Sequence, residues 1–535
     1  MQRRIQRTPR LSQRLLPHPR PDRVGACAVH RPGNHQRHPD PLRAEFLDVE
    51  ERRLPRHGSG DGRQQRDGVG NHARDLGASS AARELHRLAQ DGLLMRRANE
   101  GRADNENRKE SLKMRIQRTT AYRRRIAPLV AVAALAATGC DLEVTNPGPV
   151  QDEFLNDEQA FPSVLQGVRR ANALAYTRLA YDSGLTSFEG TPGGLVDSEF
   201  YNGKLTSENV DDHWERAQQA RWMAEDGVRR LEEALGGEFG SNQIAGRLLV
   251  LAGFANRTLG HNMCIAVFDG GPEQPYTDFL TRAEEFFTQA IGVGNASGAS
   301  DIALAAQAGR ADVRMWLGDW SGARSDATGI PEDFVFQLHH YDLDDFPDPN
   351  EVYFRGASDP WREYTIWGTF AESYYTETGD PRMGWYEIAD AVTMVYNLPF
   401  YVQLKFTSKT APHTLASGRE MILIQAEEIL ANNPGNFQAA MDLINQVRTS
   451  VVSDHTGEAL PPATASNATE AWTALKQERR VELWFDNRRF ADLRRWGLQS
   501  SPGATPMEDM SGRSNCFPVG VSEIDTNSNP LNRVS

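Results

Sequence analysis

The chain has 535 residues, of which 39% are hydrophobic and 24% charged, and its formal net charge is −13. The charge is unevenly spread, because residues 1–113 carry +9 whereas residues 140–535 carry −27. A chain as acidic as residues 140–535 is not expected to bind nucleic acid or anionic lipid.

The composition of residues 1–113 is unlike that of a folded domain. They hold 22 arginines and two lysines against 15 acidic residues, and Phe46 is their only aromatic residue. Such a segment cannot bury enough apolar surface to fold. It is either a disordered basic arm that binds nucleic acid or sequence translated from a start codon upstream of the native one. The next stretch favours the second interpretation.

Residues 114–139 have the order of a secretory signal peptide. Five arginines follow Met114, an apolar run extends over residues 126–137, and Ala-Thr-Gly precedes Cys140. This order resembles a bacterial lipobox, which predicts that Cys140 becomes the acylated first residue of the mature chain. The apolar run is too short to span a bilayer stably, so the lipid is the expected anchor. Because a signal peptide must be N-terminal, we expect the native chain to begin at Met114.

Two further cysteines, Cys264 and Cys516, follow Cys140. In the oxidising compartment that an exported chain enters, these two can form a disulfide. The alternative is a pair of buried thiols, and the sequence leaves both open. No Cys-x-x-Cys pair occurs, so a zinc ribbon is not expected.

Apolar residues spaced three and four apart predict that the mature chain is mainly helical. The predicted helices run from a cap at Asn156 to about residue 175, and over residues 209–235, 241–259, 277–293, 301–317, 417–430 and 436–447. Short turns and small residues at the helix contacts are typical of tetratricopeptide helix pairs, and residues 315–323 resemble part of that repeat. Because the pairs are unevenly spaced, we expect an irregular tetratricopeptide-like array.

Two aromatic-rich stretches, residues 186–214 and about 330–413, interrupt the helical periodicity. The flat rings of Trp and Tyr match the apolar faces of sugar rings, and Asn, Asp and Arg bind the sugar hydroxyl groups. The ligand-binding candidates in these stretches are Phe188, Tyr201, Trp361, Trp367, Tyr374 and Tyr375. The alternative for each ring is a place in the core of an irregular subdomain.

The second stretch also carries an acidic loop. Its residues Asp342, Asp344 and Asp348 are weak calcium candidates, because carboxylate oxygens are the ligands that Ca²⁺ prefers. Their spacing is not that of an EF-hand, and a solvated surface loop is the alternative interpretation. We expect the protein to need no metal or other cofactor.

In residues 478–497, charges of both signs alternate with large apolar side chains as one helix ends and a second, over residues 488–496, follows. So many charges cannot all be solvated, and some must form ion pairs inside a packed corner. The predicted structural network consists of Glu478, Arg479, Glu482, Arg489, Asp492 and Arg495, with Arg479 and Glu482 as a pair. The alternative is an anion-binding or active site, although no histidine, cysteine or glycine loop accompanies these charges.

The same stretch carries a family resemblance. Residues 478–483 read Glu-Arg-Arg-Val-Glu-Leu, and residues 489–496 read Arg-Phe-Ala-Asp-Leu-Arg-Arg-Trp. These runs resemble the C-terminal signature of the SusD/RagB family of nutrient-binding outer-membrane lipoproteins. Residues 415–421, 443–448 and 516–519 are similar to further parts of the family pattern, so the resemblance extends from about residue 140 to the C-terminus.

The resemblance implies a fold, a function and a partner. The fold would be an array of tetratricopeptide-like helix pairs with an inserted irregular region. The protein would capture oligosaccharides or other nutrients on an aromatic arc and deliver them to a SusC-like TonB-dependent receptor. It would be lipid-anchored in the outer membrane, exposed at the cell surface, and not an enzyme.

Two other functions are compatible with the residues. A tetratricopeptide-type scaffold that binds only proteins would have the same helices, but the aromatic insertion favours a small ligand. A secreted glycan hydrolase would need two facing carboxylates. No Gly-x-Ser-x-Gly, His-Glu-x-x-His or phosphate-loop motif accompanies the acidic residues.

Overall fold

The computed structural model describes residues 152–535, apart from residues 195–196, 344–345, 358–360 and 504–509. The predicted upstream segment, the signal peptide and the acylated Cys140 lie outside the described residues. Among the helices that the structure describes, none is long and apolar enough to cross a membrane.

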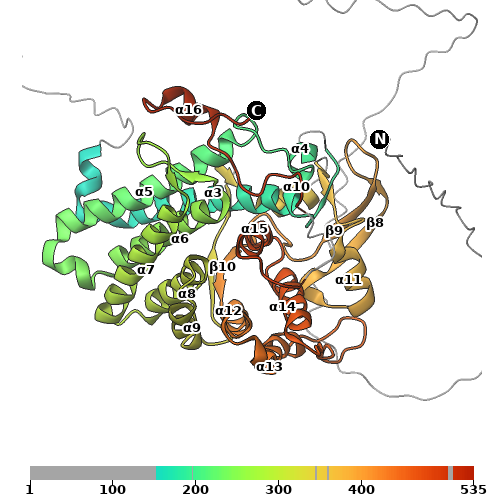
Figure 1. The fold of residues 1–535 in the computed structure, drawn as a ribbon. Helices are drawn as coiled ribbons and strands as arrows, with labels where there is room; N and C mark the ends of the chain where they lie inside the picture. The colour runs from blue at the N-terminus through green and yellow to red at the C-terminus, as the bar shows by residue number, and fades with distance from the viewer. Residues whose placement is uncertain (1–151, 195–196, 344–345, 358–360, 504–509) are drawn as a thin grey trace, which may run out of the picture. The chain divides into compact units, whose positions relative to one another are not determined.

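Helices in the first half of the described chain pack side by side (Figure 1). They are α3 (Phe161–Thr186), α5 (Asp211–Leu235), α6 (Gln243–Asn262), α7 (Thr277–Ser297), α8 (Ser300–Leu317) and α9 (Trp320–Thr328). Each of these helices packs against the next one along the chain, which is the arrangement of stacked helix pairs.

A second group of helices forms the C-terminal part. It consists of α12 (Gly418–Asn432), α13 (Phe437–Thr449), α14 (Ala468–Glu482) and α15 (Arg489–Gln499). Because α12 packs against α8 and α9 as well as α13 and α14, it joins the two groups.

The shorter elements are α4 (Asp197–Tyr201), α10 (Glu351–Ala357), α11 (Phe370–Thr378), α16 (Val521–Thr526) and the 3₁₀ turns η1 (Asp152–Asn156), η2 (Glu158–Ala160), η3 (Gly236–Ser241), η4 (Pro381–Met383) and η5 (Pro434–Asn436). The predicted fold class, mainly α with tetratricopeptide-like helix pairs, is confirmed.

Local chemistry explains where several helices begin. Asn242 caps α6 by accepting hydrogen bonds from the backbone N–H groups of Ile244 and Ala245, at 2.8 and 3.1 Å. The Ser417 hydroxyl accepts from the N–H of Glu420 at 3.1 Å, so α12 begins where the capping pattern in the sequence predicts.

The predicted start of the first helix at Asn156 is wrong. Residues 152–160 form η1 and η2, and α3 begins at Phe161 with Pro162 in its first turn. Proline has no N–H and its ring clashes with a preceding helical turn, so a helix tolerates it only at the start. Pro162 therefore sets the beginning of α3.

Small residues let α6, α7 and α8 approach one another closely. The ring of Phe287 on α7 lies between Gly253 of α6 and Gly309 of α8, where an added Cβ would come within 2.5 and 2.4 Å of it. Leu280 on α7 packs on Gly260 of α6 in the same way. A larger side chain at these glycines would push the helices apart, because protein cores are already close-packed.

The strands of the described chain form antiparallel two-stranded ladders. The pairs are β1 (Thr191–Pro192) with β7 (Tyr364–Thr365), β2 (Ile265–Ala266) with β3 (Gln274–Pro275), β4 (Val335–Leu338) with β10 (His413–Ser417), β5 (Tyr341–Leu343) with β6 (Phe346–Asp348), and β8 (Trp385–Val392) with β9 (Pro399–Gln403). Most of them lie between α9 and α12, where the sequence departs from helical periodicity. The β1–β7 pair brings the two aromatic-rich stretches together.

Candidate functional site

The loop after β1 is bonded to the turn of the β8–β9 hairpin. Gly193 donates its N–H to the carbonyl oxygen of Glu363 at 2.5 Å, and its own carbonyl oxygen accepts from the N–H of Val395 at 2.8 Å. An added Cβ at Gly193 would lie 2.4 Å from the Cβ of Thr393, so only glycine fits there. These contacts hold the segment before β7 against the hairpin.

Large aromatic side chains are exposed around β7, β8 and β9. Trp361 and Trp367, which flank β7, are 43% and 37% exposed. Tyr386 on β8 and Tyr396 in the hairpin turn are 46% and 41% exposed. We call these four residues the aromatic set. Exposed rings gathered in one region are typical of a binding site, and their flat faces can stack on a sugar ring.

A ring stack lies beside the aromatic set. Trp385 on β8 and Tyr401 on β9 stack with their ring centres 4.5 Å apart and an interplanar angle of 4°. Tyr375 of α11 meets Trp385 at 6.3 Å, and its hydroxyl donates to Asp454 at 3.1 Å. Tyr375 is half-buried, so the structure places this candidate at the edge of the stack.

Phe188 and Tyr201 form a separate pair. Their rings meet nearly at right angles, 5.6 Å apart, and the guanidinium of Arg513 lies 4.3 Å from the centre of the Phe188 ring. Both rings are half-buried. Across the part of the chain that the structure describes, no ring contact joins this pair to the aromatic set.

Tyr374, one of the ligand-binding candidates, takes the alternative place in the core. Tyr374 is only 4% exposed, and its hydroxyl donates to Asp380 at 3.1 Å and accepts from Arg448 at 2.7 Å. Burial raises the pKa of this hydroxyl to about 12. Conversely, Tyr386 and Tyr396 were not predicted candidates, because periodicity in a short hairpin does not show which rings remain uncovered.

The acidic loop does not form a metal site in the described residues. Asp348 is buried, and its carboxylate accepts from both the Nε and an Nη of Arg170, the latter at 2.8 Å. Asp342 lies 3.4 Å from the amine of Lys409, and Asp344 lies outside the described residues. No group of three possible metal ligands occurs among the residues that were placed. The two described aspartates instead neutralise neighbouring cations.

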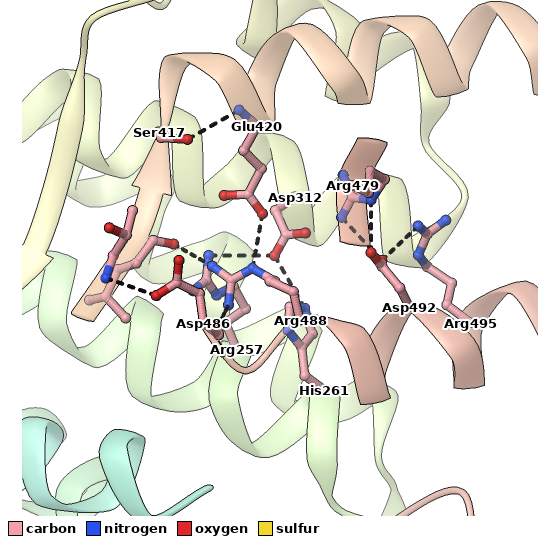
Figure 2. A network of polar contacts seen from close by, with 12 residues as sticks. Arg257, His261, Asp312, Ser417, Glu420, Arg479, Asp486, Arg488, Asp492 and Arg495 are labelled. Atoms are coloured by element: carbon pink, nitrogen blue, oxygen red, sulfur yellow. Dashed lines mark hydrogen bonds and ion pairs between the residues drawn. The ribbon is translucent and has the colours of Figure 1, made fainter. Parts of the chain in front are cut away.

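The C-terminal charges form buried ion pairs (Figure 2). Arg479 of α14 donates to Asp492 of α15 at 2.8 Å, and Arg495 donates to the same carboxylate at 3.0 Å. Arg495 also binds Glu427 of α12 at 2.7 Å, and all four residues are at most 3% exposed. Burial alone would raise the pKa of Asp492, but the charges of Arg479 and Arg495 hold it below its usual value.

A second cluster lies next to these pairs in Figure 2. Arg488 donates to Glu420 at 2.9 Å, which ties the turn before α15 to α12. Nearby, Asp312 of α8 lies 3.2 Å from His261 and 3.5 Å from Arg257, both on α6. Burial lowers the pKa of His261 to about 4 against the attraction of Asp312, so His261 is neutral at pH 7.

The predicted pairing of Arg479 with Glu482 is wrong. Arg382 of η4 donates to Glu482 at 2.8 Å and forms ion pairs with Glu478 and Asp380, each at 2.7 Å. The two predicted partners are one turn apart on α14, but Arg479 faces α15 whereas Glu482 faces η4. Burial raises the pKa of Glu478, and the charge of Arg382 opposes this only in part.

These ion pairs hold α12, α14, α15 and η4 together. Arg489, the remaining predicted member, is 2% exposed. Because these charges are closed to solvent, and Arg479 and Arg495 have carboxylate partners, a solute in water does not reach them. The geometry favours the structural interpretation over an anion-binding or active site.

Cys264 and Cys516 form a disulfide with an S–S distance of 2.08 Å. Of the two alternatives that the sequence left open, the structure shows the disulfide and not a pair of buried thiols. The bridge links the chain after α6 to the C-terminal segment across 252 residues. Hydrogen bonds reinforce this link, because Cys264 donates its N–H to the carbonyl oxygen of Phe517 at 2.9 Å, and Phe517 donates to that of Asn262 at 2.8 Å.

Comparison with known proteins identifies the C-terminal signature. Residues 419–530 match the model of the SusD family. This range contains most of α12 and all of α13 to α15, and therefore most of the buried ion pairs. No curated protein matches the chain in sequence.

Solved structures share the fold. A SusD superfamily protein from Bacteroides thetaiotaomicron VPI-5482 is similar with a TM-score of 0.54 and 16% identity, over 70% of this chain and 98% of that one. A SusD superfamily protein from Bacteroides vulgatus ATCC 8482 gives 0.51 and 13%, over 69% and 96%. A protein described as a laminarin-binding SusD-like protein gives 0.51 and 14%, over 70% and 99%. Residues 419–530 therefore carry the SusD family signature, and the chain shares its fold with SusD superfamily structures.

Proposed function

We propose that the protein binds glycans through the aromatic set and delivers them to a TonB-dependent outer-membrane transporter. The observation that carries this proposal is the exposure of Trp361, Trp367, Tyr386 and Tyr396 around one hairpin. Glu387 on β8, opposite Tyr401 of β9, is exposed and can accept hydrogen bonds from sugar hydroxyls. The laminarin-binding SusD-like protein, which has the same fold, supports a carbohydrate as the class of ligand.

Stacking predicts modest affinity that is spread over several residues. Each well-placed ring contributes on the order of 1 kcal/mol. Replacing Trp361 and Trp367 together with alanine should therefore weaken binding by about tenfold or more. Both side chains are more than a third exposed, so the melting temperature should not change.

The test is a titration of the purified protein with laminarin and a panel of other polysaccharides. Trp222→Ala is the matched control, because Trp222 is 52% exposed but lies on α5 in the helical array. The double variant should lose affinity while the control keeps it. A collapse of the melting temperature in the double variant, or unchanged affinity, would show that the glycan site lies elsewhere.

The proposed activity is binding and not catalysis. The buried carboxylates of the C-terminal network already have arginine partners, and the exposed rings form a surface on which a glycan can lie. Incubation of the purified protein with a bound oligosaccharide should leave the oligosaccharide intact. Release of shorter products would contradict this part of the proposal and favour a hydrolase.

The proposed cellular role requires an anchor and a partner. The lipobox-like sequence at Cys140 supports a lipid anchor in the outer membrane, with the protein at the cell surface. The helical array offers a broad surface for a SusC-like receptor, and motion about the anchor would let the protein act as its lid. A pull-down from solubilised outer membranes should recover a large β-barrel receptor. Recovery of periplasmic proteins alone would favour the tetratricopeptide scaffold.

A further inference from the structure

A cavity of about 320 Å³ lies on the helical array and shares no lining residue with the aromatic set. Its walls come from α3, α6, the beginning of α8, β4 and the start of β5. This volume is at the lower end of the roughly 300–1,000 Å³ that is usual for small-molecule sites. The cavity can therefore hold one small molecule rather than a length of polymer.

Two arginines line the cavity, and one of them lacks a counter-charge. Arg247 of α6 binds Asp301 at 2.9 Å. Arg169 of α3 forms no ion pair with another described residue, although it is half-buried. Burial, and then the neighbouring charge of Arg247, lower the pKa of Arg169. An anion between the two guanidinium groups would stabilise the charged form of Arg169 and so oppose both effects.

The lining has a net positive charge in an otherwise acidic protein. Arg169, Arg247 and Asp301 are its charged side chains when His339 is neutral, so the cavity carries +1, whereas residues 140–535 carry −27. The side chain of Asp301 is 61% exposed, so it can move away when a ligand competes for Arg247. A charge of +1 matches a monoanion, and guanidinium groups bind carboxylates with two parallel hydrogen bonds.

The rest of the lining adds apolar surface. Val250, Leu251, Ile302 and Leu338 lie in the walls, and the side chains of Val335 and Tyr341 remain 51% and 42% exposed. Gln337 and His339 supply polar groups between them. Such a lining favours a ligand that has an apolar face as well as a charge.

We propose that this cavity binds a small organic carboxylate, whose charge lies between Arg169 and Arg247 and whose body packs on the apolar walls. The carboxylate belongs either to a sugar acid or to an aliphatic acid, which share this chemistry. The site is separate from the proposed glycan surface, and its test does not depend on that proposal.

The test is isothermal titration calorimetry of the purified protein with glucuronate, hexanoate, glucose and inorganic phosphate. At least one of the two carboxylates should bind. The one that binds more tightly shows whether the ligand is a sugar acid or an aliphatic acid. Glucose should bind at least tenfold more weakly than glucuronate if the sugar acid is the ligand. Failure of both carboxylates to bind, or tighter binding of phosphate, would overturn the proposal.

Variants that are expected to change the carboxylate affinity in opposite directions make the test specific. Arg169→Gln should weaken carboxylate binding at least tenfold, and Arg169→Lys should restore part of the loss. Asp301→Asn should strengthen binding, because it removes the internal competitor for Arg247, and a damaged fold cannot produce such a gain. Arg216→Gln is the matched control, since Arg216 is an exposed arginine paired with Asp212 on α5. Equal losses for Arg169→Gln and Arg216→Gln would overturn the assignment.

Discussion

Asp492 is the carboxylate on which the packing of α14 and α15 depends most. It accepts hydrogen bonds from Arg479 and Arg495, and it is 3% exposed. Asp492→Asn keeps the shape of the side chain but removes its charge. Arg495 retains Glu427 at 2.7 Å, whereas the nearest remaining carboxylate oxygen to Arg479 belongs to Glu427, at 3.9 Å. The substitution therefore leaves Arg479 as a buried and poorly compensated charge.

Breaking a buried ion pair by removing one partner costs about 3–5 kcal/mol. The entropy of unfolding of the roughly 380 residues from 152 to 535 is about 0.8 kcal/mol per kelvin, so we expect the melting temperature of Asp492→Asn to fall by about 4–6 °C.

Glu482→Gln is the matched control for this substitution. Glu482 is only half-buried, and in the variant the guanidinium of Arg382 keeps its ion pairs with Asp380 and Glu478, each at 2.7 Å. No buried charge is left without a partner at that position, so the control should lose about 1 kcal/mol or less.

Thermal unfolding at several pH values is the assay for Asp492→Asn. The folded-state pKa of Asp492 is lowered, so its contribution to stability is present above the unfolded pKa and is lost as the pH falls through the folded value. The difference between the wild type and Asp492→Asn should therefore shrink in acid. An unchanged melting temperature with lost ligand binding would refute the structural assignment and make this corner a functional site.

Three further predictions concern other parts of the chain. Burial raises the pKa of Glu189 to about 8, although the hydrogen bond from the N–H of Phe485 acts in the opposite direction. The stability that Glu189 contributes is therefore present below its unfolded pKa and is lost as the pH rises through the folded pKa. Glu189→Gln should thus gain melting temperature relative to the wild type between pH 5 and pH 9, and a constant difference would contradict this. Replacing Cys264 and Cys516 with serine should cost about 2–4 kcal/mol in the free energy of unfolding, and an unchanged melt would show that the bridge is not stabilising. Cys140→Ala should release the protein from membranes in a fractionation experiment, and retention would reveal another anchor.

The helices of the array could be predicted closely from the sequence. The expected ranges 277–293 and 301–317 correspond to α7 (Thr277–Ser297) and α8 (Ser300–Leu317). Helical periodicity and caps act over a few residues, so a local pattern contains them. The start of α3 was missed because the effect of Pro162 outweighed the capping ability of Asn156.

The ion-pair partners of charged residues and the exposure of aromatic side chains could not be predicted in the same way. Spacing on α14 suggested that Arg479 pairs with Glu482, but the partner of Glu482 is Arg382, which is 100 residues away in the sequence. Similarly, the sequence places Tyr374 and Tyr375 side by side, and only the packing of α11 shows that Tyr374 is buried. Such contacts depend on how distant segments meet, which periodicity does not contain.

A crystal structure of the protein with the polysaccharide fragment that binds most tightly tests the central claim most directly. We predict a sugar ring stacked on Trp361 or Trp367, with further contacts along the β8–β9 hairpin. A glycan bound instead on the helices α5 to α9, away from the aromatic set, would contradict the proposed function of this surface.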